Sequence, residues 1–294
     1  MNKKVFQWKT YWELARPADY VKNFFVLAPL FFAGDFFDAG KFIPAALALF
    51  VFCLLASGSY AINDVFDAKQ DRRHPAKQGR PVASGRIGPG FALTAACIWI
   101  GVGTAISAAI SQAFLLVGMA YLLLQFLYSA LIKHWPLCDV LAISAGFILR
   151  LIAGGIAVQV CVSTWLIICT GLLTLFLAIG KRRCELTVVK NPIIHRKIFQ
   201  YYSPKLLDKG LIVTGISTIS SYAAYICFSG ARASNLNIWL ISTIPLVVAG
   251  LFRLSTIFRH DCHYRGIMEI IVKDTIIKTI LAAWVCIYFA VLYL

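Results

Sequence analysis

Residues 41–71 read KFIPAALALFVFCLLASGSYAINDVFDAKQD, an apolar run followed at once by a short cluster of acids. The run over 41–62 has 22 residues, and about 20 apolar residues are enough to carry a helix across a bilayer. The stretch therefore predicts a membrane-spanning helix that ends in a charged segment at the membrane surface.

The rest of the chain repeats this pattern. Of its 294 residues 60% are hydrophobic and 14% are charged, whereas soluble domains are about 45–50% apolar and about 25% charged. We expect an all-α, polytopic transmembrane helical bundle of about nine spans, with residues 1–294 forming a single integral-membrane domain. The expected spans are 23–38, 41–62, 91–109, 112–132, 138–159, 163–180, 210–229, 236–253 and 274–294. Asp35 interrupts the first one, which is also the shortest.

The loops between these spans fall into two classes. With the N-terminus in the cytoplasm, one side collects Lys3, Lys4 and nearly all other Lys and Arg residues, and the other side keeps only Lys41 and Arg232. This is the bias of the positive-inside rule, and it supports an odd number of crossings. The long polar loops are also on the cytoplasmic side, so we expect the active site there.

The net charge of +15 is spread over short loops between spans. It indicates membrane lipids and phosphorylated substrates as partners rather than nucleic acid. The nine cysteines are scattered without a CxxC pair, so we interpret them as small hydrophobic residues and not as disulfides or metal ligands.

The acidic cluster has helical spacing. If the helix continues past residue 62, Asp64, Asp67 and Asp71 fall at i, i+3 and i+7 on one face, with Asn63 at its edge. Carboxylates this close repel one another, and Mg²⁺ relieves the repulsion while keeping positions for water and phosphate. We interpret the three as metal-binding and catalytic residues; the alternative is a solvated helix end.

A basic loop follows directly, and it offers a counterpart for phosphate. Arg72, Lys77 and Arg80 are expected to share the charge of a diphosphate with the metal. Taken alone, the same cations could be a topology signal.

Two motifs carry a resemblance to a known family. The NDxxDxxxD stripe after the second span and RPxxSG before the third resemble the UbiA superfamily of intramembrane prenyltransferases. Segments such as 16–23, 146–155, 180–186 and 202–208 resemble one branch of it, the bacterial decaprenyl-phosphate phosphoribosyltransferases. The resemblance covers about residues 14–210, with a weaker echo at 269–274.

The segment after the sixth span separates the branches. Prenyltransferases with aromatic acceptors carry a second DxxxD stripe there, whereas this chain has Lys181, Arg182, Arg183 and Glu185. Cations at this place could hold phosphate directly, or they could again mark topology. Arg150 lies inside an expected span, where a charge is costly and usually has a function. Asp139 is about three helical turns away from it, too far to pair with it directly.

The resemblance implies a reaction. A Mg²⁺-dependent enzyme would transfer a 5-phosphoribosyl group from phosphoribosyl diphosphate (PRPP) to a polyprenyl phosphate of the decaprenyl type, for cell-envelope biosynthesis at a bacterial inner membrane. The substrate-binding residues expected on this basis are Lys22, Asn63, Arg72, Lys77, Arg80, Lys133, Asp139, Arg150, Lys181, Arg182, Glu185 and Tyr201.

Two alternatives are prenyl transfer from an isoprenoid diphosphate to an aromatic acceptor, and a transporter of similar span number. Gly/Pro-broken segments in matching halves would favour the transporter, and the sequence lacks a convincing pair. Polyprenyl chain length, oligomeric state and the downstream pathway stay open.

Overall fold

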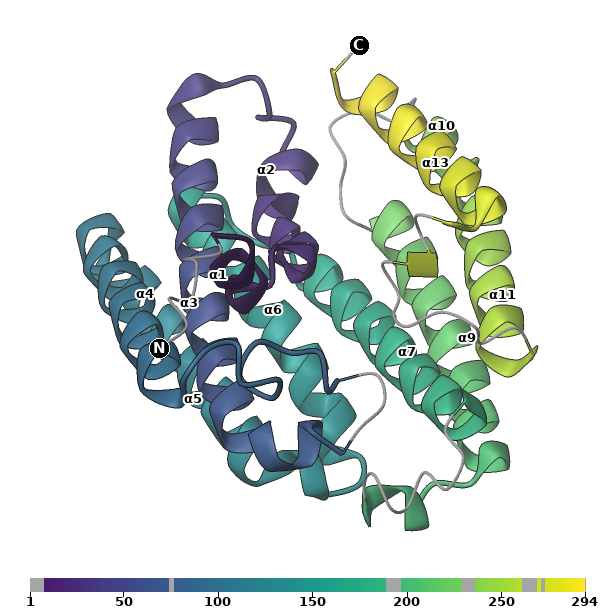
Figure 1. Ribbon diagram of the computed structural model, residues 1–294. Coiled ribbons are helices and arrows are strands. Elements are labelled where there is room, and N and C mark those ends of the chain that lie inside the picture. The colour runs from purple at the N-terminus through teal and green to yellow at the C-terminus, as the bar shows by residue number, and fades with distance from the viewer. Residues whose placement is uncertain are drawn as a thin grey trace. The chain divides into compact units, whose positions relative to one another are not determined.

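The computed structural model describes residues 8–73, 77–188, 197–228, 236–260, 269–270 and 273–293 (Figure 1). Within these ranges every regular element is a helix. The elements are α1 (Trp8–Ala15), η1 (Pro17–Leu27), α2 (Ala28–Phe32), α3 (Ala39–Asp71), α4 (Pro89–Ile110), α5 (Gln112–Ala130), η2 (Ile132–His134), α6 (Cys138–Val158), α7 (Thr164–Val188), η3 (Lys197–Gln200), α9 (Pro204–Phe228), α10 (Leu236–Ile241), α11 (Ile244–His260) and α13 (Thr275–Tyr293).

In the described ranges, eight segments are long and apolar enough to cross a membrane, so the protein is a polytopic integral membrane protein. They correspond to the second through ninth expected spans. The first expected span, 23–38, is not a long α-helix: it contains the end of the 3₁₀ helix η1 and the five-residue helix α2. Pro17 and Pro29 each stand at the first or second position of their helix, where a missing N–H costs nothing.

The segment made of η1 and α2 nevertheless runs the depth of a bilayer beside α3, and Figure 1 shows α2 next to that helix. Its contacts are antiparallel: Tyr20 bonds Ser57, Asn23 bonds Cys53, and further along Leu30 packs with Ala45. A 3₁₀ helix rises about 2.0 Å per residue, so the 11 residues of η1 and the 5 of α2 reach about 30 Å together. That length matches the hydrocarbon core.

The helices group into two compact units. The first comprises residues 1–130 and 149–161, and its core gathers Phe52, Leu55, Phe114 and Tyr121. The second comprises residues 131–148 and 162–294, with Phe176, Leu251 and Phe258 in its core. A single domain stays a prediction. Helix α6 contributes its first half to the second unit and its second half to the first.

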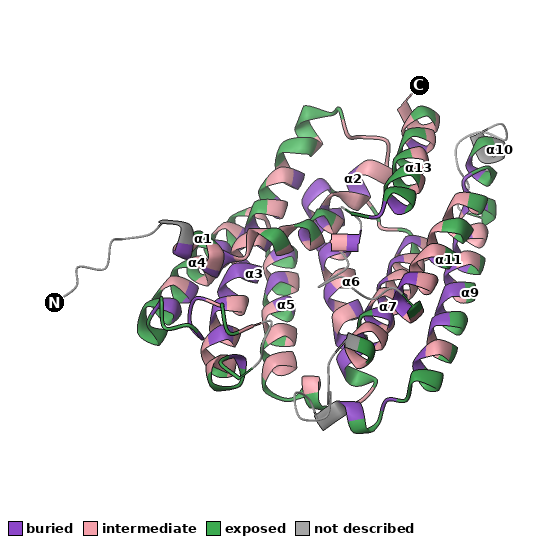
Figure 2. Cartoon of the chain, turned by 45° about the vertical axis from the view of Figure 1, so that its right-hand side comes forward, coloured by how far each residue is buried: buried purple, intermediate pink, exposed green. Residues whose placement is uncertain are grey.

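Small residues allow close helix packing within the first unit. A Cβ atom on Gly58 of α3 would lie 2.5 Å from Ile100 of α4, and one on Gly103 of α4 would lie 2.8 Å from Leu55. Helices in lipid associate through such close contacts because burial of apolar surface offers no driving force there. Figure 2 shows the burial of each helix; the apolar window of α13 is only 11% buried, as expected for a lipid-facing helix.

The cysteine prediction is wrong at one position. Seven cysteines of the described chain are free thiols, as expected, but Cys184 near the end of α7 takes part in a disulfide. A search for CxxC spacing tests only cysteines three positions apart, and Cys184 has no such neighbour, so that search could not have found this bond.

Candidate metal and diphosphate site

Helix α3 continues past the apolar run to Asp71. The prediction that Asp64, Asp67 and Asp71 lie along one helical stretch is therefore confirmed, and Asn63 lies beside them, half-buried. Asp64 is 1% exposed and Asp71 is 3% exposed, whereas Asp67 is half-buried. Buried carboxylates need partners, since an isolated ion is costly away from water.

Three cations provide these partners within the first unit. Arg80 bridges two acids, with Nη1 at 3.2 Å from Asp64 Oδ1 and 2.6 Å from Asp71 Oδ2. Arg16 donates from Nη2 to the same Asp64 Oδ1, and Lys77 Nζ lies 3.9 Å from Asp71 Oδ1. Arg80 and Lys77 were expected at this site; Arg16 was not assigned a role from the sequence.

The backbone holds both arginines at the carboxylates. Arg16 joins α1 to η1 in a left-handed conformation with φ 54°, and its guanidinium lies 5.3 Å from the ring centre of Tyr60. Arg80 sits in a compact turn: its N–H donates to the Lys77 carbonyl, and its own carbonyl accepts from the Ser84 N–H and hydroxyl. A non-glycine residue with positive φ is uncommon, and such strain is found often at functional sites.

The site offers the ligands that Mg²⁺ prefers. Asp64 Oδ2 is buried and has no hydrogen-bond partner among the described residues, as an oxygen reserved for a cation would be. In the same part of the chain no three His, Cys, Asp or Glu side chains are gathered closely enough to hold a metal as they stand. The donor atoms thus fit a cation, but arginines now neutralise two of the three carboxylates.

Two other expected residues of this unit have local partners. Lys22 pairs with Asp19 at 2.5 Å, and both side chains are partly exposed. Arg72, at the C-cap of α3, donates from Nε to the Ala83 carbonyl at 3.0 Å, which ties the basic loop to the helix end. Arg72 is exposed, and this contact is one of loop structure.

Arg150 is buried in the first unit, 3% exposed. Its Nε donates to Asn23 Oδ1 at 2.8 Å and its Nη2 to the Tyr121 hydroxyl at 2.8 Å. Asn23 in turn bonds Cys53, which precedes Asp64 by three turns of α3, about 16 Å along the axis. Arg150 therefore lies well away from the acidic stripe along α3 and joins η1 to α5 and α6.

A second charged cluster lies inside the other unit. Arg182 is 1% exposed; its Nε donates to Asp139 Oδ2 at 2.6 Å and its Nη1 to Glu185 Oε2 at 2.6 Å. The Tyr202 hydroxyl donates to Asp139 Oδ1 at 2.7 Å and accepts from the Leu137 N–H. Burial and the bond to Asp139 raise the pKa of Tyr202, so the phenol stays protonated and donates at neutral pH.

The expected residues around this cluster divide by exposure. Lys181 is exposed and Lys133 is half-buried. Tyr201, the expected tyrosine, is 58% exposed, whereas its neighbour Tyr202 makes the bond to Asp139. Arg183 pairs with Asp208 at 2.9 Å on the other side of α7. Sequence alone cannot tell which of two adjacent tyrosines, or of three adjacent cations, points inward, because their shared partner Asp139 is distant in the chain.

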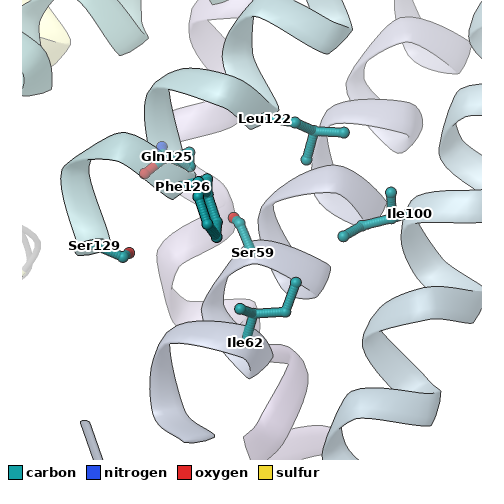
Figure 3. Close-up of a pocket in the computed structure, with 7 residues that line it drawn as sticks. All are labelled: Ser59, Ile62, Ile100, Leu122, Gln125, Phe126 and Ser129. Atoms are coloured by element: carbon teal, nitrogen blue, oxygen red, sulfur yellow. The ribbon is translucent and has the colours of Figure 1, made fainter. Parts of the chain in front are cut away.

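A cavity of about 150 Å³ lies between α3, α4 and α5 of the first unit (Figure 3). Ile62, Ile100, Leu122 and Phe126 give it an apolar lining, and Ser59, Gln125 and Ser129 add polar groups. The volume corresponds to about five water molecules. Asp64 does not line this cavity, so the cavity is separate from the acidic stripe.

Comparison with known proteins agrees with this arrangement. The model of the "UbiA prenyltransferase family" matches residues 23–189. A decaprenyl-phosphate phosphoribosyltransferase of Corynebacterium glutamicum is 32% identical over 94% of this chain and 85% of its own length. A decaprenyl-phosphate phosphoribosyltransferase of Mycolicibacterium smegmatis is 30% identical over 92% of this chain and 88% of its own length.

Solved structures show the same fold. A UbiA homolog from Archaeoglobus fulgidus bound to DMAPP and Mg²⁺ has a TM-score of 0.72 and 20% identity, covering 96% of this chain and 99% of that one. The family match, the two relatives and the fold all lead to one conclusion: this chain belongs to the UbiA prenyltransferase family.

Proposed function

We propose that the protein transfers a 5-phosphoribosyl group from PRPP to a polyprenyl phosphate of the decaprenyl type, in a Mg²⁺-dependent reaction at the cytoplasmic membrane face. The observation that carries this proposal is the 32% identity, along nearly the whole chain, to a relative named for that activity. The Lys/Arg bias of the loops supports the cytoplasmic orientation.

The acidic stripe is the proposed place of the donor's diphosphate. Asp64, Asp67 and Asp71 would hold Mg²⁺, which supplies charge neutralisation for the departing diphosphate. Arg16, Arg80 and Lys77 are within reach of the same carboxylates and would bind the phosphate oxygens. Guanidinium groups suit this task because they make paired, charge-assisted hydrogen bonds to phosphate.

The acceptor needs little activation. A polyprenyl phosphate is already ionised at neutral pH, so its oxygen can attack the ribose anomeric carbon without a strong general base. The new C–O bond forms as the bond to diphosphate breaks, and diphosphate leaves with the electron pair. We assign exposed Lys181, and not buried Arg182, to contact with substrate phosphate in the second unit.

Prenyl transfer to an aromatic acceptor is the rival function. Related structures are described as bound to GPP or DMAPP with Mg²⁺, but at 20% identity they inform on fold alone. In this chain the segment after α7's apolar part holds Lys181, Arg182 and Arg183, and Glu185 there is bonded to Arg182. These residues do not form a second carboxylate pair for another cation.

The test follows a label into lipid. Purified protein in detergent or nanodiscs is incubated with Mg²⁺, a polyprenyl phosphate and labelled PRPP. The mass of the lipid product is then measured by mass spectrometry. We expect a mass increase of one phosphoribosyl unit, inhibition by pyrophosphate and no effect of 4-hydroxybenzoate. Prenylation of 4-hydroxybenzoate from a prenyl diphosphate, without any phosphoribosyl lipid, would establish the rival instead.

A further inference from the structure

Arg16 and Arg80 occupy the carboxylates that the proposed function gives to a cation. Both donate to the same oxygen, Asp64 Oδ1, and Arg80 also holds Asp71. The other Asp64 oxygen is buried and has no partner among the described residues. One carboxylate thus has an oxygen satisfied by arginines and an oxygen left for another ligand.

The net charge of the acids and cations at the stripe indicates how a divalent cation would bind without diphosphate. Arg16, Lys77 and Arg80 contact Asp64 and Asp71, and with Asp67 on the same helix the group counts three acids and three cations, so its formal charge is balanced. A divalent cation would leave an excess of two positive charges, and it would compete with arginines for Asp64 and Asp71. A diphosphate supplies negative charges that restore the balance and gives the arginines new acceptors.

The two arginines are placed for such an exchange. Their side chains are 19% and 24% exposed, so each reaches solvent while its partner Asp64 does not, with 1% exposure. The backbone of Arg16 has a positive φ, and the backbone of Arg80 is part of a hydrogen-bonded turn. Both backbones are therefore held in place, and each guanidinium can change partner by rotation of its side chain.

We propose that Arg16 and Arg80 are exchangeable counter-ions, which neutralise Asp64 and Asp71 until a cation and a diphosphate bind together, and which then transfer to the diphosphate. The inference rests on the proposed metal site but not on the identity of the group transferred. It goes beyond that site in making cation and diphosphate binding strongly cooperative.

The experiment measures binding without turnover. Mn²⁺ serves as a spectroscopic probe for the metal and inorganic pyrophosphate as a probe for the donor, with purified full-length protein. In the wild type we expect pyrophosphate binding to tighten at least tenfold when Mn²⁺ is present. Arg16→Gln and Arg80→Gln should bind Mn²⁺ alone more tightly than the wild type and lose most of that enhancement.

Arg73→Gln is the matched control. Arg73 follows the stripe directly and its side chain is exposed, and among the described residues it contacts neither Asp64 nor Asp71, so its removal should leave Mn²⁺ binding unchanged. Thermal unfolding guards against misfolding: Mn²⁺ alone should stabilise Arg16→Gln more than it stabilises the wild type, because the freed carboxylate gains a ligand.

The outcomes separate the two proposals. If the Arg16 and Arg80 variants bind Mn²⁺ no better than the wild type and keep the pyrophosphate enhancement, the exchange is refuted while the metal site stands. Absence of Mn²⁺ binding in every form, with and without pyrophosphate, refutes the metal assignment and the exchange with it. Phosphoribosyl transfer is tested separately by the lipid product, so its failure leaves the exchange intact.

Discussion

The three aspartates of α3 differ in what they do for the fold. Asp64 is buried and paired with two arginines, whereas Asp67 is half-buried on the same face. We expect Asp64→Asn and Asp67→Asn both to lose transfer activity, because each removes a charge that the metal needs. Only Asp64→Asn should also lose stability, by about 1.5–3 kcal/mol, since Arg16 and Arg80 lose a charged hydrogen-bond acceptor.

Activity and unfolding must therefore be measured together. A transfer assay with Mg²⁺, followed by EDTA and restoration of Mg²⁺, reports the metal, and urea or thermal unfolding in detergent reports the fold. Near-wild-type turnover in Asp67→Asn would remove this residue from the metal site.

Adjacent Lys181 and Arg182 should respond in opposite ways. Arg182 is 1% exposed between Asp139 and Glu185, so Arg182→Gln should destabilise the protein by about 3–5 kcal/mol. Lys181 is exposed, and Lys181→Gln should change stability by less than about 0.5 kcal/mol. Loss of a phosphate contact would instead cost roughly 1.5–3 kcal/mol of binding free energy, and KM for a phosphorylated substrate would rise accordingly.

The measurement pairs steady-state kinetics with thermal unfolding for both variants. A stable Arg182→Gln protein with raised KM would show that Arg182 serves the substrate, as the sequence suggested. Sequence could identify this cationic segment but not its inward member. The partner of Arg182, Asp139, is 43 positions away in the chain, and Tyr202, which bonds Asp139, is 20 positions away. The stripe on α3 was predictable since one helix orders all three acids.

At the scale of elements, apolar runs predicted the spans within a few residues, but not the ends of the helices. Helices α3, α7 and α11 continue to Asp71, Val188 and His260, well past their apolar parts. Hydropathy reports where the bilayer ends, whereas hydrogen bonding and side-chain packing decide where a helix ends. The expected span 23–38 differed most, because proximity to α3 decides the conformation of η1 and α2.

A glycine fixes how closely η1 can approach α6. A Cβ atom on Gly154 would lie 1.9 Å from the Val26 carbonyl oxygen, a backbone atom that cannot move by a rotamer change. Gly154→Ala should therefore push η1 away and destabilise the protein by roughly 1–3 kcal/mol or more. It should also lower activity, because Arg16, which holds Asp64, stands at the N-cap of η1.

Gly101→Ala is the control for this prediction. Gly101 lies in α4, and no atom is within 4 Å of the position of its Cβ, so alanine should be neutral or stabilising by up to about 1 kcal/mol. Unfolding of both variants in the same detergent checks the difference. Equal stability of Gly154→Ala and the wild type would mean that the backbone contact is not this close in the membrane.

For the whole molecule, the number of crossings decides which face carries the chemistry. Eight described segments qualify as spans by length and hydropathy, and η1 with α2 adds a crossing by contact. Arg16 meets Asp64 at one end of α3, and Leu30 packs with Ala45 nearer the other end. The rise from Ala45 to Asp64 is about 29 Å, so we expect the chain to cross the bilayer between these two contacts.

Nine crossings would place the first and last described helices at opposite sides of the membrane. With the Lys/Arg-rich loops inside, a green fluorescent protein at the N-terminus or after His260 should fluoresce in a bacterial host. The same reporter after Tyr293 should be dark, because α13 carries it to the outer side of the membrane. Green fluorescent protein does not mature there when it is exported unfolded. A dark N-terminal fusion, together with fluorescence of the fusion after His260, would contradict the crossing by η1 and α2. In that case Arg16 and Asp64 could not meet at the cytoplasmic face, and the proposed diphosphate site would lose its membrane orientation.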